Sequence, residues 1–138
     1  MSSMPLHLMK HPEPLVVARL DPGAEPDWDW QQGPFASLSR TPHETSVVCL
    51  AQDVPDGVTV EGPFIGVEVA GPLAFDAVGV MAEILNPLVA VNISVLAFAT
   101  YDTDWVLVPE GDAAVAVEVW RRAGLIVTPT VLTGRRDS

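Results

Sequence analysis

The fold of this 138-residue chain is decided by residues 71–108, GPLAFDAVGVMAEILNPLVAVNISVLAFATYDTDWVLV. This stretch predicts a turn, a helix, a strand over residues 93–100, a tight hairpin and a second strand over residues 105–108. Apolar residues three and four apart predict that one helix face is buried, and these residues are Val78, Met81, Ala82, Leu85 and Val89. Asn86 and Pro87 are expected to kink or end the helix, because proline lacks a backbone donor.

The start of this helix is a candidate ligand site. Asp76 lies in the turn before the helix, and Gly79 is expected within its first turn. A glycine there lets a ligand approach backbone N–H groups that have no partner inside the helix. The N–H groups of residues 77–80 could hold a carboxylate. As simpler alternatives, Asp76 could cap the helix, and Asp102 and Asp104 could form only a tight turn.

The composition indicates a folded, acidic protein. Hydrophobic residues make up 49% of the chain, and 18 acidic residues against 7 basic ones give a formal net charge of −11. The apolar fraction suffices for a core, while the charge argues against nucleic acid or an anionic membrane as the main partner. A single cysteine cannot form an intramolecular disulfide, and the N-terminus carries no signal-peptide pattern. We therefore expect a cytoplasmic protein.

The flanking segments predict further strands and a second helix. Two strands, at residues 6–9 and 15–20, are expected with a reversal between them at Pro12 and Pro14. Further strands are predicted at residues 35–39, 45–50, 64–70 and 125–132.

The second helix is expected to begin with Asp112 as its N-cap and to end at Gly124. Its predicted inner face consists of Ala113, Ala116, Val117 and Trp120. From residue 63 the order is strand–helix–strand–strand–helix–strand, the ferredoxin-like βαββαβ pattern of the α+β class. We expect both helices to cover one face of a four-stranded antiparallel sheet. The N-terminal half predicts strands and no convincing helix.

The chain shows no recognisable catalytic or metal-binding pattern. His7, His11 and His43 are its only histidines, and no second cysteine accompanies Cys49. Their spacing matches no structural zinc pattern, so we expect exposed loop histidines and a small buried cysteine. Since no nucleophile stands beside a base, we predict that the chain is not an enzyme and uses no cofactor.

Two other pairs of residues have simple structural explanations. Glu68 and Glu83 are most simply surface carboxylates. Trp28 and Trp30 interrupt a polar loop and are expected to pin it by burying area, with a carbohydrate or peptide platform as the alternative.

Residues 100–108, TYDTDWVLV, resemble the signature STYxTDyiLV of the small bacterial ACT-domain proteins, to which the ACT units of the animal cytosolic arginine sensor are related. Further blocks resemble this family in the same order, at residues 41–48 (TPHETSVV), 71–75 (GPLAF) and 79–95. The resemblance covers about residues 15–124. The sequence departs from the family at Ala74, where aspartate is usual, and at Ala99, where serine is usual. Ala99 removes a hydroxyl beside the hairpin.

The resemblance implies two tandem ACT-like units, a degenerate and mostly β unit at residues 5–62 and a complete one at 63–133, followed by a tail at 134–138. It implies a non-enzymatic regulatory module that binds an amino acid at a seam between two units, and hence a homodimer. The implied ligand-binding residues are Asp76, Ala77, Val78, Gly79, Val80, Ser94, Val95, Thr100, Tyr101, Asp102 and Asp104. The alternative is a structural or protein-interaction scaffold that no longer binds a ligand.

Overall fold

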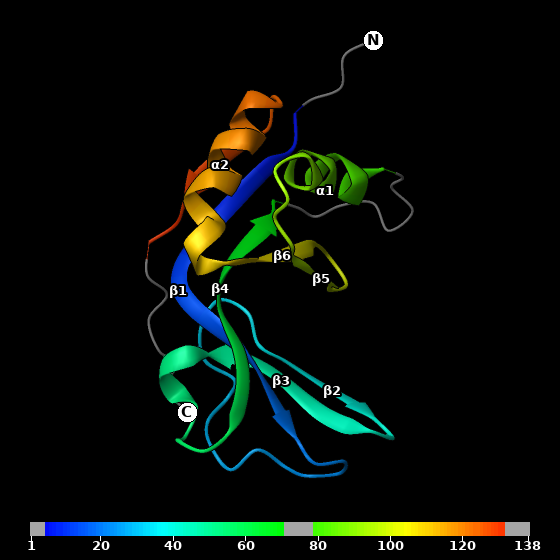
Figure 1. Ribbon diagram of the computed structural model, residues 1–138, viewed down its shortest axis with the longest axis vertical. Coiled ribbons are helices and arrows are strands. Elements are labelled where there is room, and N and C mark those ends of the chain that lie inside the picture. Colours follow the sequence, from blue (N-terminus) through cyan, green and yellow to red (C-terminus); the bar gives the residue numbers. More distant parts are fainter. Residues whose placement is uncertain (1–4, 71–78, 132–138) are drawn as a thin grey trace. The chain divides into compact units, whose positions relative to one another are not determined.

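The computed structural model describes residues 5–70 and 79–131 (Figure 1). Its elements are β1 (His7–Leu20), β2 (Ser37–Thr41), β3 (Glu44–Leu50), η1 (Ala51–Asp53), β4 (Thr59–Val69), α1 (Val80–Ala90), β5 (Leu96–Ala99), β6 (Asp104–Pro109), η2 (Glu110–Asp112), α2 (Ala113–Arg122) and β7 (Ile126–Pro129). The described residues divide into two compact units. The N-terminal unit contains residues 13–64, and the C-terminal unit contains residues 5–12 and 65–131. Our predicted division into ACT-like units at residues 5–62 and 63–133 stays a prediction.

The C-terminal unit has the α+β, ferredoxin-like class that was predicted, with one strand more than expected. Neighbouring strands follow the order β7-β1-β4-β6-β5. β1 pairs with β7 in parallel, with His7 beside Ile126, and β5 pairs with β6 as an antiparallel hairpin. The expectation of a four-stranded antiparallel sheet is therefore wrong, because β1 lies between β7 and β4. Pairing between segments so far apart leaves no local sequence pattern.

Both helices cover one face of this sheet, as expected. A single buried cluster joins side chains from β1, β4, β6, β7 and the two helices, including Leu8, Val67, Val106, Ile84 and Trp120. The indole Nε1 of Trp120 in α2 donates a hydrogen bond to the Ile84 carbonyl oxygen of α1 at 2.8 Å. The two helices are therefore joined by a buried polar contact as well as by apolar packing.

The buried face of α1 differs from the predicted one. Ile84 and Leu88 are buried, whereas Val89 is 71% exposed. Two adjacent apolar stripes run along this helix with the same spacing, one through Ile84 and Leu88 and the other through Leu85 and Val89. The prediction chose the second, but the first is buried. The helix does not end at Pro87 but continues to Ala90.

Both helices end in the same hydrogen-bond pattern. After α1, Asn92 has a φ of 60°, and the Ile93 N–H bonds to the Leu88 carbonyl at 3.0 Å. After α2, Gly124 has a φ of 94°, and the Leu125 N–H bonds to the Trp120 carbonyl at 3.0 Å. These bonds satisfy terminal carbonyls that have no partner within the helix.

The predicted inner face of α2 is confirmed. Ala113, Ala116 and Trp120 are buried, and Val117 packs against the core cluster. Asp112 occupies the N-cap position, but its side chain makes no capping hydrogen bond.

The N-terminal unit is mostly β, and the strands expected at residues 35–39 and 45–50 correspond to β2 and β3. β3 pairs antiparallel with both β1 and β2. Trp28 and Trp30 pack against a buried cluster that includes Val47 and Cys49, so they hold their loop to the unit as expected. The only helical segment within residues 13–64 is the short η1.

The expected reversal between residues 9 and 15 is wrong, because β1 is one strand of 14 residues. Lys10 is the last residue of β1 in register with β7, and Leu15 is the first in register with β3. Pro12 and Pro14 fall between these two ladders. Their missing N–H groups therefore cost neither ladder a hydrogen bond.

Candidate functional site

The eight described residues of the predicted ligand site fall into three places. Gly79 and Val80 begin α1, Ser94 and Val95 precede β5, and Thr100, Tyr101, Asp102 and Asp104 belong to the β5–β6 hairpin. Asp76, Ala77 and Val78 lie outside the described residues.

No described residue covers the start of α1. Gly79 is the N-cap, not part of the first turn as expected, and its backbone is left-handed with a φ of 84°. It is exposed, and a Cβ built on it would meet nothing within 4 Å. The first bond of the helix runs from the Glu83 N–H to the Gly79 carbonyl at 3.0 Å. The N–H groups of residues 80–82 precede it and are free of intrahelical partners, at the positive end of the helix dipole.

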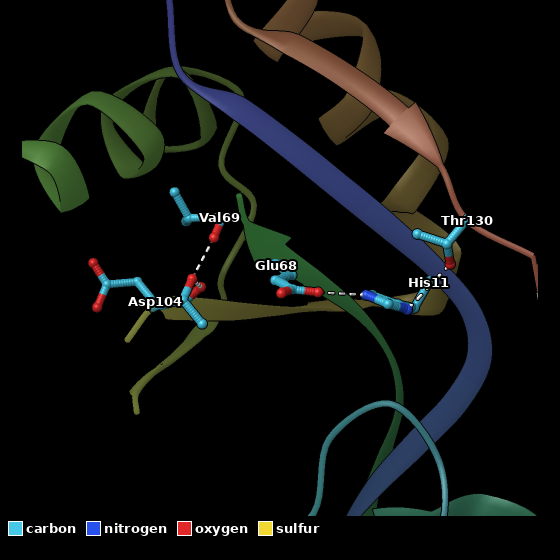
Figure 2. Close-up of polar contacts among 6 residues, drawn as sticks. His11, Glu68, Val69, Asp104 and Thr130 are labelled. Carbon is cyan, nitrogen blue, oxygen red and sulfur yellow. Dashed lines mark hydrogen bonds and ion pairs between the residues drawn. The ribbon is translucent and has the colours of Figure 1, made fainter. Parts of the chain in front are cut away.

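The hairpin turn is held by two threonines. The Thr100 N–H donates to the Thr103 carbonyl at 2.8 Å, and the Thr100 hydroxyl donates to the same oxygen at 3.0 Å. The Thr103 hydroxyl in turn donates to the Val69 carbonyl at the end of β4, the bond drawn beside Asp104 in Figure 2. Thr103 is therefore a positioning residue that sequence reasoning missed, although it lies inside the TYDTDWVLV motif.

The Thr103–Val69 bond places the hairpin beside the end of β4. Asp104 is half-buried and lies opposite Ala99, while Tyr101 is 84% exposed. Ser94 and Val95 have different surroundings from each other: Ser94 is exposed, and Val95 packs against the core cluster. The side chain of Val95 is therefore partly engaged in core packing.

A buried polar cluster surrounds His11, which sequence reasoning placed in an exposed loop. The His11 ring is stacked on Trp105 with 5.1 Å between ring centroids, and the residue is only 9% exposed. Its Nε2 lies 3.0 Å from Oε1 of Glu68, and its Nδ1 lies 3.1 Å from the hydroxyl of Thr130 (Figure 2). The prediction was wrong because β1 continues through this position. Glu68 is likewise no free surface carboxylate.

Both ring nitrogens of His11 have partners and an indole covers one ring face, so we assign this cluster a structural role. It joins β1, β4, β6 and the segment that follows β7. His7 is also part of β1, with Nε2 at 2.8 Å from the Thr128 hydroxyl. Only His43 is exposed as expected.

Cys49 is fully buried, as expected. Burial raises the pKa of its thiol, so the thiolate form is disfavoured in the folded protein. Across the described ranges, no three His, Cys, Asp or Glu side chains are grouped to hold a metal ion. Within those ranges, no helix has the length and apolar character needed to span a membrane.

Comparison with protein families matches residues 59–122 to the ACT domain and residues 14–57 to a family of N-terminal domains. The curated relatives include subunit 1 of the cytosolic arginine sensor for mTORC1. The Homo sapiens protein is 41% identical and the Rattus norvegicus protein 37% identical over 51 residues, which are 37% of this chain. The aligned segment spans only 16% and 15% of those two proteins.

Solved structures share the whole fold. An Agrobacterium tumefaciens protein has a TM-score of 0.84 and 29% identity, covering 94% of this chain and 96% of its own. The regulatory subunit of aspartate kinase from Thermus flavus has a TM-score of 0.59 and 10% identity, covering 88% and 97%. At such low identity the second likeness shows the fold alone. The segment of residues 59–122 belongs to the ACT domain family.

Proposed function

We propose that the chain is a non-enzymatic regulatory module that binds a free amino acid between the start of α1 and the β5–β6 hairpin. One observation carries this proposal beyond the family match: within residues 5–70 and 79–131, no side chain caps or covers the N-terminus of α1 at Gly79. The proposed site also includes Asp76, Ala77 and Val78. We further propose that the protein works in the cytoplasm, as the name of its arginine-sensor relatives says of them.

The chemistry of an amino acid suits this arrangement. Its carboxylate would accept hydrogen bonds from the free N–H groups of residues 80–82, where the helix dipole favours an anion. Its ammonium would bind Asp104 or Asp102, or a carbonyl of the residues that precede β5. These carboxylates favour a neutral or basic amino acid over an acidic one.

We propose that the functional unit is a homodimer with the ligand at its seam. β5 is the last strand in the sheet order, so among the described residues one of its edges pairs with no strand. Such edges are templates for pairing with another chain. Exposed apolar side chains lie on β5 and around the end of α1, namely Leu96, Val89 and Val91.

Thermal unfolding with each of the twenty amino acids at millimolar concentration tests the proposal. A ligand that binds only the folded state at 100 times its Kd stabilises it by about 2.7 kcal/mol. We expect one or a few neutral or basic amino acids to raise the Tm. Gly79→Leu should abolish this shift, because leucine strains the left-handed backbone and blocks the open helix end. Gly23→Leu is the matched control, since Gly23 also has a positive φ and open space but lies in the other unit.

A scaffold that binds partners but no ligand is the second candidate. The 84% exposure of Tyr101 and the missing hydroxyl at Ala99 favour it. No Tm shift with any amino acid, together with self-association in sedimentation, would replace the sensor proposal by this one.

A further inference from the structure

A hollow in the C-terminal unit has two basic residues in its lining. It has a volume of about 380 Å³ and is lined by Lys10, Ala114, Val117, Arg121, Val127 and Pro129. Small-molecule sites in proteins typically have volumes of about 300–1,000 Å³. None of its lining residues belongs to the amino-acid site proposed above.

The strand register explains why a lysine lines this hollow. Lys10 lies two residues after Leu8 on β1, so both side chains project from the same face of the strand. Leu8 is fully buried in the core beneath the helices. Lys10 therefore occupies a core-facing position where β1 leaves the core, and Pro129 is its register partner on β7.

Arg121 lies across the hollow on α2 and is held in place. Its Nη2 donates to the carbonyl oxygen of Val127 at 2.8 Å. The guanidinium retains further N–H donors beyond that bond. Fixing the side chain in this way reduces the conformational entropy that a ligand contact would cost.

No acidic residue in the described part of the chain compensates these two cations. Within residues 5–70 and 79–131, no carboxylate pairs with Lys10 or Arg121, and none lines the hollow. Two like charges on one concave surface repel each other, and an anion between them would relieve that repulsion. The floor supplies apolar contact, since Val127 is buried and Val117 packs against the core.

From this geometry we infer that the hollow between α2, β1 and β7 binds a small carboxylate with an apolar body. The carboxylate lies between Lys10 and Arg121, and the hydrocarbon part lies on Val117 and Val127. A free amino acid fits less well, because its ammonium would lie close to two cations. This site thus takes a different class of ligand from the one at the start of α1.

Titration of the full chain with 4-methylpentanoate, followed by backbone amide NMR, tests this inference. We expect saturable shifts of Ala114, Val117 and Val127, and binding at least tenfold weaker for the uncharged 4-methylpentanamide. Lys10→Met should weaken binding of the acid about tenfold and leave that of the amide unchanged. Arg122→Gln is the control, since Arg122 pairs with Glu118 and does not line the hollow.

A second pair of variants tests where the ligand binds without changing the charge of the hollow. Ala114→Phe should fill the hollow and abolish binding, whereas Val115→Phe, one position away on the exposed side of α2, should not. Equal affinity for acid and amide, shifts confined to residues 79–82 and the hairpin, or no saturable shift at all would overturn the inference. Amino-acid binding at the start of α1 can succeed or fail without affecting these readouts.

Discussion

The Nε2 of His11 lies 3.0 Å from Oε1 of Glu68, and this contact joins β1 to β4 inside the sheet of the C-terminal unit. The same ring reaches Thr130 through Nδ1. One side chain thus connects the beginning of the chain to its middle and to the end of its described part.

Replacing His11 should destabilise the fold. His11→Leu leaves the Glu68 carboxylate and the Thr130 hydroxyl without their partner, so we expect a loss of about 1–3 kcal/mol in the free energy of unfolding. Urea unfolding followed by circular dichroism measures it. His43→Leu is the control, because His43 is exposed and should change stability by no more than about 0.5 kcal/mol. Equal effects of the two substitutions would contradict a structural role for the His11 cluster.

Removing the Thr103 hydroxyl should loosen the hairpin. Thr103→Val keeps the shape of the side chain but loses the bond to the Val69 carbonyl, at a cost of about 1 kcal/mol. Amide hydrogen exchange of residues 100–104 should become faster. Thr59→Val, at the exposed start of β4, should leave these amides unchanged. Unaltered exchange in Thr103→Val would show that the hairpin does not depend on this anchor.

Truncating Trp120 should cause a large loss of stability. Trp120→Phe removes the bond to the Ile84 carbonyl and leaves a gap in a fully buried position, so we expect a loss of about 2–4 kcal/mol. Val115→Ala on the same helix should cost far less, because Val115 is 47% exposed. Chemical denaturation of both variants gives the comparison. A loss below that of Val115→Ala would mean that the α1–α2 contact is not important for stability.

The burial of Cys49 should make the free energy of unfolding depend on pH in the alkaline range. The folded-state pKa of its thiol is raised above the ordinary 9.0. Between the two pKa values the folded state therefore binds more protons than the unfolded state, so stability falls as pH rises above about 9. Cys49→Ala should remove this component. The difference in unfolding free energy between the two proteins, measured from pH 7 to 10.5, should shrink as pH rises. A constant difference would contradict the raised pKa.

Local sequence patterns predicted those elements whose limits and buried faces depend on residues close by in the sequence. The apolar spacing of α2, with Gly124 after it, sufficed to place both its buried face and its end. In α1 the same reasoning failed, because two adjacent apolar stripes were available and only tertiary packing selects Ile84 and Leu88. The single strand β1 was missed because Pro12 and Pro14 are turn signals unless the strand changes partners at that point.

The candidate site shows the same limit. The motif TYDTDWVLV correctly predicted the hairpin, whereas Gly79 is the N-cap of α1 and its role in ligand binding stays a prediction. The cation-lined hollow could not be foreseen, because Lys10 and Arg121 are brought together only by the pairing of β1 with β7. Residues distant in sequence carry no periodic signal of their contact.

The place of β1 between β7 and β4 has a consequence for how the chain is made. His11 and its partner Thr130 are 119 residues apart in the sequence. The C-terminal unit therefore cannot complete its sheet until residues 126–130 have been synthesised, and contacts of such long range slow folding. Until β7 arrives, β1 has an unpaired edge that another chain could occupy. The interval between the synthesis of β1 and that of β7 therefore exposes this strand to mispairing with other chains.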